Sequence, residues 1–112
     1  MRIHKPWGYE DLFAVNEHYA FKLLFMKQGC RCSLQYHEVK QETLYVLSGQ
    51  LKFTHEGQSR ILKRGEYFTI LPKQVHRMEA VEDSIYLEAS TPELDDVVRL
   101  EDEYGREGTS EA

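Results

Sequence analysis

The sequence predicts an all-β fold, either a sandwich or a barrel. Short apolar or alternating runs recur at a spacing of about eight to twelve residues along most of the chain. Turn glycines such as Gly29, Gly49 and Gly65 separate several of these runs. Almost no segment repeats its apolar residues at the helical period. Together these three observations favour a domain built of short strands.

The N-terminal segment is expected to be irregular. Residues 4–11 carry a Pro and a Gly on either side of Trp7, the single tryptophan of the chain, and both residue types interrupt regular structure. We interpret this segment as an arm that anchors the ring of Trp7 on the barrel surface. Such an arm could also cover a pocket or meet a second subunit.

The middle of the chain predicts a series of strands joined by polar or glycine-containing turns. In one of them, Phe21, Leu23 and Phe25 face one way and the even-numbered residues face the other. The predicted strands comprise residues 13–15, 20–27, 33–37, 42–48, 50–55, 59–63, 67–71, 75–80 and 84–89.

The pattern changes after Ser90. Thr91 is suited to cap a helix and Pro92 to occupy its first position, so a single helical turn is expected. Residues 97–102 then predict an edge strand. Residues 107–112 are expected to form a disordered tail at the end of the chain. No internal repeat and no second domain are found.

The length and the net charge of the chain limit the classes of function that it can have. A chain of 112 residues with 41% hydrophobic content suits one domain with a small core. The net charge of −5 and the scattered Lys and Arg residues argue against a nucleic-acid partner, because binding along a phosphate backbone needs a basic stripe. Binding of an anionic small molecule is not excluded by this charge, since a few local cations suffice to bind one phosphate.

The sequence also predicts a cytoplasmic protein without a membrane partner. Its apolar runs are too short and too interrupted to span a membrane, and its first residues lack the apolar region of a signal peptide. Cys30 and Cys32 are too close in sequence for an ordinary disulfide, so we expect reduced, structural thiols. A Cys-x-Cys pair could bind a soft metal, but no second pair accompanies it.

Candidate metal ligands fall in two stretches. Residues 29–49 begin and end on glycine and contain Gln35, His37 and Glu42. Alternation along a strand puts Gln35 and His37 on one face, and Glu42 can return to that face from the next strand. His76 follows a turn glycine, an apolar run and a proline. Two imidazoles, a carboxylate and an amide oxygen suit one divalent cation, with Zn expected first and Mn, Co, Ni or Fe as alternatives.

These stretches resemble the two conserved motifs of the cupins. The first motif runs Gly, five residues, His-x-His, three or four residues, Glu, six residues, Gly, and Gln35 here replaces its first histidine. The second motif runs Gly, five residues, Pro-x-Gly, two residues, His, and Leu71 and Lys73 here replace its Pro and Gly. The resemblance implies a jelly-roll β-barrel, with a single domain and its arm spanning residues 1–106.

Three further segments make the resemblance more specific. KPWGYED at residues 5–11, SLQYH at 33–37 and STPELDDVVRLEDEYGR at 90–106 are similar to the cupin domain of the mannose-6-phosphate isomerase family, particularly the form fused to a mannose-1-phosphate guanylyltransferase. This implies a metal-dependent isomerase that interconverts mannose 6-phosphate and fructose 6-phosphate, or a close relative, through an enediolate. The family commonly has a histidine-rich run with an Arg where this chain has residues 38–41, a difference that bears on substrate preference.

An isomerase of this kind needs a base that moves a proton between C1 and C2 of the open-chain sugar. Glu88 is our first candidate, because its strand could point it into the barrel beside the metal. Lys40, in the turn after His37, is the other candidate. The plain structural alternative for Glu88 is an exposed glutamate on a strand.

The phosphate of the substrate needs a cation. The candidates are Arg99, which lies in the stretch that resembles the isomerases, with Arg31 and Lys22. Arg77 is disfavoured because it directly follows a metal ligand and so points to the opposite face of its strand.

Other functions stay open. A non-catalytic sugar-binding or regulatory cupin that holds a metal is the main alternative, because a bare barrel has little besides its arm, its tail or a second subunit to exclude water. A metal-dependent dioxygenase is less favoured, since the ligand set has only two imidazoles. The resemblance also implies a homodimer, joined through edge strands and the arm. The remaining histidines, His4, His18 and His55, are interpreted as surface residues.

Overall fold

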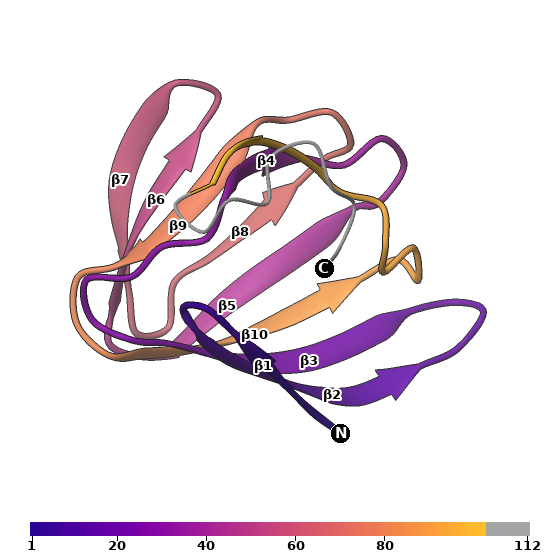
Figure 1. Ribbon diagram of the computed structural model, residues 1–112, viewed down its shortest axis with the longest axis horizontal. Helices are drawn as coiled ribbons and strands as arrows, with labels where there is room; N and C mark the ends of the chain where they lie inside the picture. The colour runs from indigo at the N-terminus through magenta and orange to yellow at the C-terminus, as the bar shows by residue number, and fades with distance from the viewer. Residues whose placement is uncertain (103–112) are drawn as a thin grey trace.

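The computed structural model describes residues 1–102 and consists of strands joined by turns (Figure 1). The predicted all-β fold is confirmed, and most predicted strands are found within one or two residues of their expected bounds. None of the described residues forms a helix that could cross a membrane, and the cytoplasmic location stays a prediction. The strands are β1 Arg2–Lys5, β2 Gly8–Val15, β3 Ala20–Met26, β4 Leu34–Tyr36, β5 Glu42–Ser48, β6 Gln50–His55, β7 Gln58–Lys63, β8 Tyr67–Ile70, β9 His76–Ala80, β10 Ser84–Ser90 and β11 Val98–Glu101.

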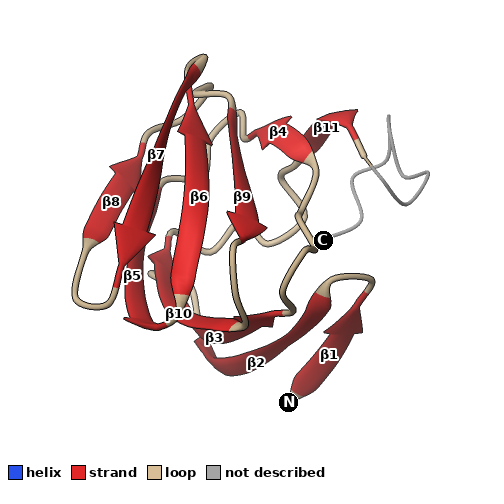
Figure 2. Cartoon of the chain, turned by 90° about the vertical axis from the view of Figure 1, so that its left-hand side faces the viewer, coloured by secondary structure: helices blue, strands red, loops and turns tan. Residues whose placement is uncertain are grey.

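Two antiparallel sheets enclose the core. The six-stranded sheet has the order β1-β2-β3-β10-β5-β8, and the five-stranded sheet has the order β11-β4-β9-β6-β7. Figure 2 shows β6, β7 and β9 as one wall, with β1, β2 and β3 running across the bottom of the other. Neighbours in each sheet are often far apart in the sequence, as in the pairing of β3 with β10 and of β4 with β9. The predicted edge strand near the C-terminus is confirmed as β11, at one edge of the five-stranded sheet.

The N-terminal segment is a β-hairpin, so the prediction of an irregular arm is wrong. β1 pairs with β2 from Arg2 opposite Asp11 to Lys5 opposite Gly8. Trp7 lies in the turn, and its side chain is buried in the core instead of lying on the surface. The glycine serves a close approach, because a Cβ atom at Gly8 would lie 2.0 Å from the carbonyl oxygen of Phe25.

The predicted helical turn after Ser90 is also wrong. This segment folds as consecutive tight turns, in which the N–H of Leu94 donates to the carbonyl of Pro92 and the N–H of Asp96 donates to that of Glu93. The predicted tail, residues 107–112, lies outside the described part of the chain.

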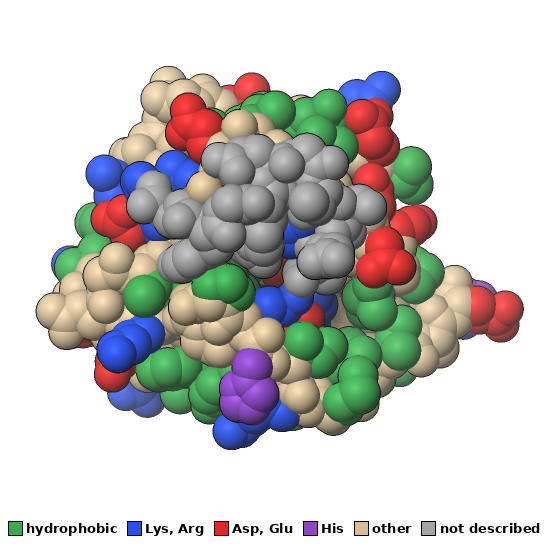
Figure 3. Space-filling view, viewed as in Figure 1, with side chains coloured by type: hydrophobic (Ala, Val, Ile, Leu, Met, Phe, Trp, Pro, Cys, Tyr) green, Lys and Arg blue, Asp and Glu red, His purple; other side chains and the backbone are tan. Residues whose placement is uncertain are grey.

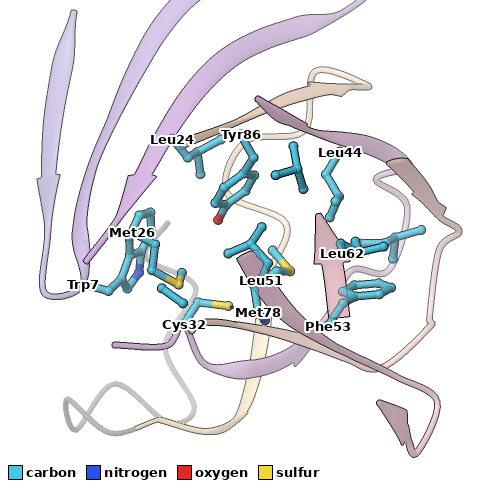
Figure 4. Packing of buried hydrophobic residues seen from close by; sticks show 13 residues of the cluster. Trp7, Leu24, Met26, Cys32, Leu44, Leu51, Phe53, Leu62, Met78 and Tyr86 are labelled. Carbon is cyan, nitrogen blue, oxygen red and sulfur yellow. Dashed lines mark hydrogen bonds between the residues drawn. The ribbon is translucent and has the colours of Figure 1, made fainter. Parts of the chain in front are cut away.

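The apolar core fills one part of the interior. Trp7, Met26 and Cys32 lie together at one side of the cluster in Figure 4, and Phe53 and Leu62 lie at the other. Full burial of each large apolar side chain contributes about 1.5–3 kcal/mol. The cluster consists of Trp7, Leu24, Met26, Cys32, Leu44, Val46, Leu51, Phe53, Leu62, Ile70, Met78, Ala80 and Tyr86.

The rest of the interior is charged. The inner face of β3 changes from Leu24 and Met26 to Lys22, which lies directly opposite Glu88 on β10. On β5 the inner face changes in the same way, from apolar residues to Glu42. The sheet therefore carries an apolar half and a charged half on one face, and the charged half positions the candidate site.

Candidate metal centre

Three buried side chains converge at one end of the barrel. His37 directly follows β4, Glu42 is the first residue of β5, and His76 is the first residue of β9. Their potential ligand atoms all lie within 4.8 Å of one another. The Oε1 atom of Glu42 is 3.1 Å from the Nε2 of His37 and 3.2 Å from the Nε2 of His76. The three residues are at most 3% exposed, so the cluster is shielded from bulk water.

The outer ring nitrogens fix the tautomers of both histidines. The Nδ1 of His37 contacts the carbonyl oxygen of Asp96, and the Nδ1 of His76 lies 2.9 Å from the carbonyl oxygen of Gln74. A carbonyl can only accept, so each Nδ1 carries a hydrogen, and Nε2 is the ring atom that each histidine directs towards Glu42. Backbone carbonyls hold metal-binding histidines in this way.

The donor atoms of the cluster fit a cation. The Nε2 of His76 and the Oε2 of Glu42 are buried and make no hydrogen bond of good geometry; their near neighbours are the Oε1 of Glu42 at 3.2 Å and the ammonium of Lys40 at 3.4 Å. Burial opposes ionisation of Glu42, yet the charge of Lys40 and the contacts with both histidines hold the pKa of Glu42 well below its ordinary value. A carboxylate and the Nε2 atoms of two imidazoles facing one point are the groups that bind a divalent metal, and the metal would displace any hydrogen from these Nε2 atoms.

Gln35, the predicted fourth ligand, lines the same cavity. It lies opposite His76 in the pairing of β4 with β9 and opposite Arg99 in the pairing of β4 with β11. Its Oε1 atom accepts a hydrogen bond of 2.6 Å from the hydroxyl of Ser33, a fully buried residue. An amide oxygen has a second lone pair, so this bond orients Gln35 and still leaves it able to act as a ligand.

Asp96 supports the metal cluster from the turns before β11, and sequence reasoning missed it. Its carboxylate accepts hydrogen bonds from the N–H groups of Glu38, Val39 and Lys40, at 2.7–3.0 Å. Its carbonyl contacts the ring of His37. Burial alone would raise the pKa of Asp96, but the three N–H groups lower it. One residue thus shapes the turn after His37 and orients its imidazole.

The second motif keeps its turn although it lacks the usual glycine. Lys73, in the place of that glycine, has a φ of 69°, which is the left-handed conformation that glycine adopts most easily. Its N–H donates to the carbonyl of His37 at 2.6 Å. The turn therefore links the chain just before His76 to the other histidine ligand.

Alternating charges extend from the metal cluster through the cavity. Lys40 lies between Glu42 and Glu88, with its Nζ atom 3.4 Å from a carboxylate oxygen of each. Lys22 lies between Glu88 and Glu10, at 3.8 Å and 3.4 Å. Lys5 ends the row, 3.9 Å from Glu10.

These charges line a cavity of about 70 Å³ that opens to solvent and also includes Arg99. Among the described residues, its walls carry four cationic side chains and three carboxylates, so a bound divalent ion would add to a net positive charge. The face shown in Figure 3 has cationic and anionic side chains next to each other in its central hollow. Such a cavity suits an anionic ligand that also carries hydroxyl groups.

The pKa values of Glu88 and Lys40 are both raised, but for different electrostatic reasons. Burial, followed by the negative charge of Glu42, raises the pKa of Glu88. Burial disfavours the charged form of Lys40, but Glu88 and Glu42 outweigh it and raise the pKa of Lys40. Lys40 is therefore a cation at neutral pH, and Glu88 is a stronger base than an exposed glutamate.

Most of the predicted catalytic and phosphate-binding residues line this cavity. Glu88, Lys40, Lys22 and Arg99 are buried and form part of its wall. Arg31 is not among the described residues that line it, so its role in phosphate binding stays a prediction: residues 31 and 79 form an isolated bridge, and the Arg31 side chain lies 3.7 Å from Glu79, partly exposed. Residue 32 takes the inward position, which turns its neighbour Arg31 outward.

Four other residues with sequence predictions lie outside this cavity. Arg77 points away from it, as expected, and its Nε donates to the carbonyl of Cys32 at 2.9 Å. His4 and His18 are exposed, as expected. His55 is half-buried in β6, where it stacks on Phe53, so its interpretation as a surface residue is wrong.

Glu10 and Lys5 were missed because they lie in the segment interpreted as an arm. Once residues 8–15 are treated as a strand, alternation puts Glu10 on its inner face, opposite Leu24 of β3. That period-two pattern is the signal by which the sequence could have revealed the far end of the charged row.

The cysteines are free thiols, as expected. Cys32 lines the cavity and is buried, and its sulfur accepts a hydrogen bond from the N–H of Met78 at 3.3 Å. Burial raises the pKa of Cys32 to about 11. The thiol is therefore protonated at neutral pH and is a poor nucleophile or metal ligand.

Comparison with known proteins identifies related sequences. The family model described as "Cupin domain" matches residues 22–90. Mannose-1-phosphate guanylyltransferase ManC of Salmonella typhimurium is 32% identical over 114 residues, covering 93% of this chain and 23% of that protein. Alginate biosynthesis protein AlgA of Pseudomonas aeruginosa is 32% identical over 110 residues, with the same coverage. The chain thus spans about a quarter of the length of these relatives.

Solved structures support the same fold. KdgF from a Halomonas species superimposes with a TM-score of 0.75 over 79% of this chain and 81% of that chain, at 22% identity. An RmlC-like cupin from Shewanella frigidimarina has a TM-score of 0.71 at 17% identity, over 75% of each chain.

Proposed function

Because this chain belongs to the cupin family, we propose that it is a metal-dependent sugar-phosphate isomerase, which interconverts mannose 6-phosphate and fructose 6-phosphate or a closely related pair. The observation that carries the proposal is the buried Glu42 between the Nε2 atoms of two imidazoles, with Lys40 joining it to Glu88. One relative is named for mannose 1-phosphate chemistry, which supports a mannose phosphate as substrate. Its guanylyltransferase activity is not part of the proposal, since the chain covers only 23% of that protein.

His37, Glu42 and His76, with Gln35 as the fourth ligand, are the residues that would hold the metal. Zn is the first expectation, and Mn, Co, Ni and Fe are alternatives. When bound, the ion supplies a Lewis acid for the C1 and C2 oxygens of the open-chain sugar, where an enediolate develops negative charge.

Glu88 is the proposed base. It removes the proton from C2 of the aldose, the C–H electron pair forms the C1–C2 double bond, and the C1 carbonyl oxygen takes up the negative charge. The proton is then returned to C1, and the proton of the C2 hydroxyl is transferred to the C1 oxygen, so that a carbonyl forms at C2 and the neutral ketose results. Lys40 is less suited to the role of base because it lies between two carboxylates and stays protonated; it instead fixes the carboxylate of Glu88.

The phosphate of the substrate would bind cationic side chains of the cavity wall. Lys22 and Arg99 are the candidates retained from the sequence, and Lys5 joins them at the far end of the charged row. A phosphate and an extended sugar chain would then span the distance between these cations and the metal ligands.

The test is a coupled assay of fructose 6-phosphate formed from mannose 6-phosphate. Protein stripped with chelator is reloaded separately with Zn, Mn, Co, Ni or Fe. We expect turnover to disappear on stripping and to return with one of these metals. Glu88→Gln should lower kcat by about 10²–10⁴-fold while its metal content stays unchanged. His76→Ala should lose both its turnover and its bound metal.

Glu79→Gln is the matched control, because Glu79 is a strand glutamate outside the cavity. Its turnover should equal that of the unmodified protein. Folded, metal-loaded protein that turns over no sugar phosphate would overturn the isomerase and favour the alternative of a non-catalytic sugar-binding or regulatory cupin.

A further inference from the structure

Tyr86 lies where the apolar half of the interior meets the charged half. It is 1% exposed and belongs to the apolar cluster, yet it also forms part of the wall of the charged cavity. On β10 it is two residues from Glu88, so both side chains point to the inner face of the strand. Tyr86 therefore brings to this cavity a hydroxyl group that the proposed reaction does not use.

The neighbours of Tyr86 on both adjacent strands are apolar. In the strand pairing it lies opposite Leu24 of β3 and Val46 of β5, and neither side chain can form a hydrogen bond. Figure 4 shows the hydroxyl oxygen of Tyr86 pointing into the interior, towards the side where Met26 and Cys32 lie. Within residues 1–102, no group forms a hydrogen bond of good geometry with this hydroxyl.

A buried tyrosine usually finds a partner for its hydroxyl. A phenylalanine of almost the same shape would fill the position without leaving a polar group unsatisfied. The hydroxyl of Tyr86 thus has no evident use in holding the described part of the fold together. Because the residue lines the cavity, the hydroxyl is available to a ligand bound there.

The hydroxyl of Tyr86 stays protonated. Burial is the main cause that raises the pKa of Tyr86 well above its ordinary value, and the carboxylates around the cavity act in the same direction. A neutral phenol donates one hydrogen bond and accepts others, as a sugar hydroxyl does. The cations of the cavity suit a phosphate, whereas this phenol suits the neutral, hydroxyl-bearing part of a ligand.

We propose that Tyr86 is a ligand-binding residue, whose hydroxyl forms a hydrogen bond with one hydroxyl group of an open-chain sugar phosphate in the cavity. This role rests on the proposed function, because it requires a sugar phosphate in the cavity, but it does not require turnover.

The order of the inward residues on β10 indicates which part of the sugar Tyr86 contacts. Ser90 lies opposite Glu42 of the metal cluster, Glu88 is the next inward residue, and Tyr86 follows two residues further along. Two residues of a strand span ~7 Å. With Glu88 at C2, Tyr86 would contact a hydroxyl group beyond C2.

Such a contact would make Tyr86 a specificity-determining residue. A ligand that carries the contacted hydroxyl gives the phenol its missing partner. A deoxygenated ligand leaves the phenol unsatisfied in an apolar wall, and sites of this kind reject the analogue that lacks the hydroxyl. The cavity would therefore favour fully hydroxylated sugar chains.

The test is calorimetric titration of the full chain, reloaded with Zn, with mannitol 6-phosphate. This open-chain sugar-alcohol phosphate lacks a carbonyl and cannot be isomerised, so its binding is measured without turnover. Tyr86→Phe removes only the hydroxyl, and its dissociation constant should be about 5–10-fold higher than that of the unmodified chain. Its metal content should be unchanged, and its midpoint in urea should be equal or higher. A hydroxyl with a structural role would instead lower the midpoint and leave the affinity unchanged.

The 3-, 4- and 5-deoxy analogues of mannitol 6-phosphate identify the contacted hydroxyl. The unmodified chain should bind one of them about 5–10-fold more weakly than the parent compound. Tyr86→Phe should bind that analogue and the parent compound equally, because the two changes remove the same hydrogen bond.

Tyr45→Phe is the matched control, since Tyr45 lies opposite Leu87 on the outer face of the same sheet and is 41% exposed. Its affinity should equal that of the unmodified chain. The proposal is overturned if the unmodified chain does not bind mannitol 6-phosphate, if Tyr86→Phe binds it as tightly, or if Tyr45→Phe weakens binding equally. Binding that depends on Tyr86 without turnover of mannose 6-phosphate would overturn only the isomerase and leave the role of Tyr86 in place.

Discussion

Gln35 and His76 lie directly opposite each other on β4 and β9. The amide of Gln35 therefore occupies a position from which a third imidazole could reach the metal-binding point. An amide oxygen is a weaker donor to a borderline metal than an imidazole nitrogen. Gln35→His should therefore hold Zn at least about ten times more tightly than the unmodified chain, as measured by competition with a chromogenic chelator.

The control for this variant is Gln41→His, because Gln41 is exposed just before β5. It should leave the affinity unchanged. Equal affinity in Gln35→His and the unmodified chain would show that residue 35 does not approach the ion.

Lys40 balances two buried carboxylates, and its removal should destabilise the fold. Lys40→Met leaves Glu42 and Glu88 without their shared cation, so in metal-free protein we expect a loss of about 3–5 kcal/mol in the free energy of unfolding. Glu88→Gln in the same background should recover about 1–3 kcal/mol, because one of the two unpaired charges is then removed. Urea denaturation of the single and double variants measures this coupling, and strictly additive effects would contradict it.

Asp96 should stabilise the protein in a pH-dependent way. Its carboxylate accepts three backbone N–H groups, and the pKa is lowered from its ordinary value of 3.8 although burial acts in the other direction. A carboxylate whose pKa is lower in the folded than in the unfolded protein stabilises the fold fully when the pH is above the unfolded-state pKa. This stabilisation is lost as the pH falls through the folded-state pKa. Asp96→Ala should cost about 1–2 kcal/mol at pH 7, and the difference from the unmodified chain should shrink below about pH 4.

Asp95→Ala is the control for this measurement, since Asp95 is the exposed neighbour of Asp96. Its stability should follow the unmodified chain at every pH. A constant difference for Asp96→Ala down to the acid limit would mean that the carboxylate charge is not what stabilises the turn.

The two cysteines should differ in reactivity. Cys30 is half-buried, whereas Cys32 is buried and its pKa is raised to about 11. A thiol reagent such as Ellman's should therefore modify Cys30 in the native protein and both residues after denaturation. Fast modification of both in the native state would contradict the burial of Cys32, and Cys30→Ser identifies which thiol reacts.

Sequence reasoning worked where spacing alone defines the structure. The interval between His37 and Glu42 spans one turn between strands that are consecutive in the sequence, β4 and β5, although the two strands belong to different sheets. His76 could be added because the second motif has its own spacing, although Lys73 replaces a glycine and adopts the same left-handed backbone.

Alternation could not decide which side of a strand faces inward. In residues 20–26 both sides contain apolar residues, and hydrophobicity alone would favour the side with Phe21, Leu23 and Phe25 as the core. The structure puts Lys22 inside, because Glu88 and Glu10 on the neighbouring strands neutralise it. Which side of the strand faces inward is determined by its pairing with strands that are distant in the sequence, and this pairing cannot be deduced from one sequence alone.

The position of Trp7 shows a related limit. Pro and Gly around a tryptophan are typical of an irregular segment, but here they allow a tight turn and a close approach to Phe25. The hairpin hides Glu10 and Lys5 inside the barrel, which is why the charged row was predicted only in part.

The ligands of the candidate centre belong to both sheets: Glu42 starts a strand of the six-stranded sheet, and His76 starts a strand of the five-stranded one. A chain that has been synthesised only as far as β8 carries Gln35, His37 and Glu42 but lacks the second imidazole. Such a chain would respond weakly to metal. During synthesis, tight metal uptake would therefore begin only after β9 has emerged and closed against β4, and resistance to a chelator would report that the two halves of the barrel have joined.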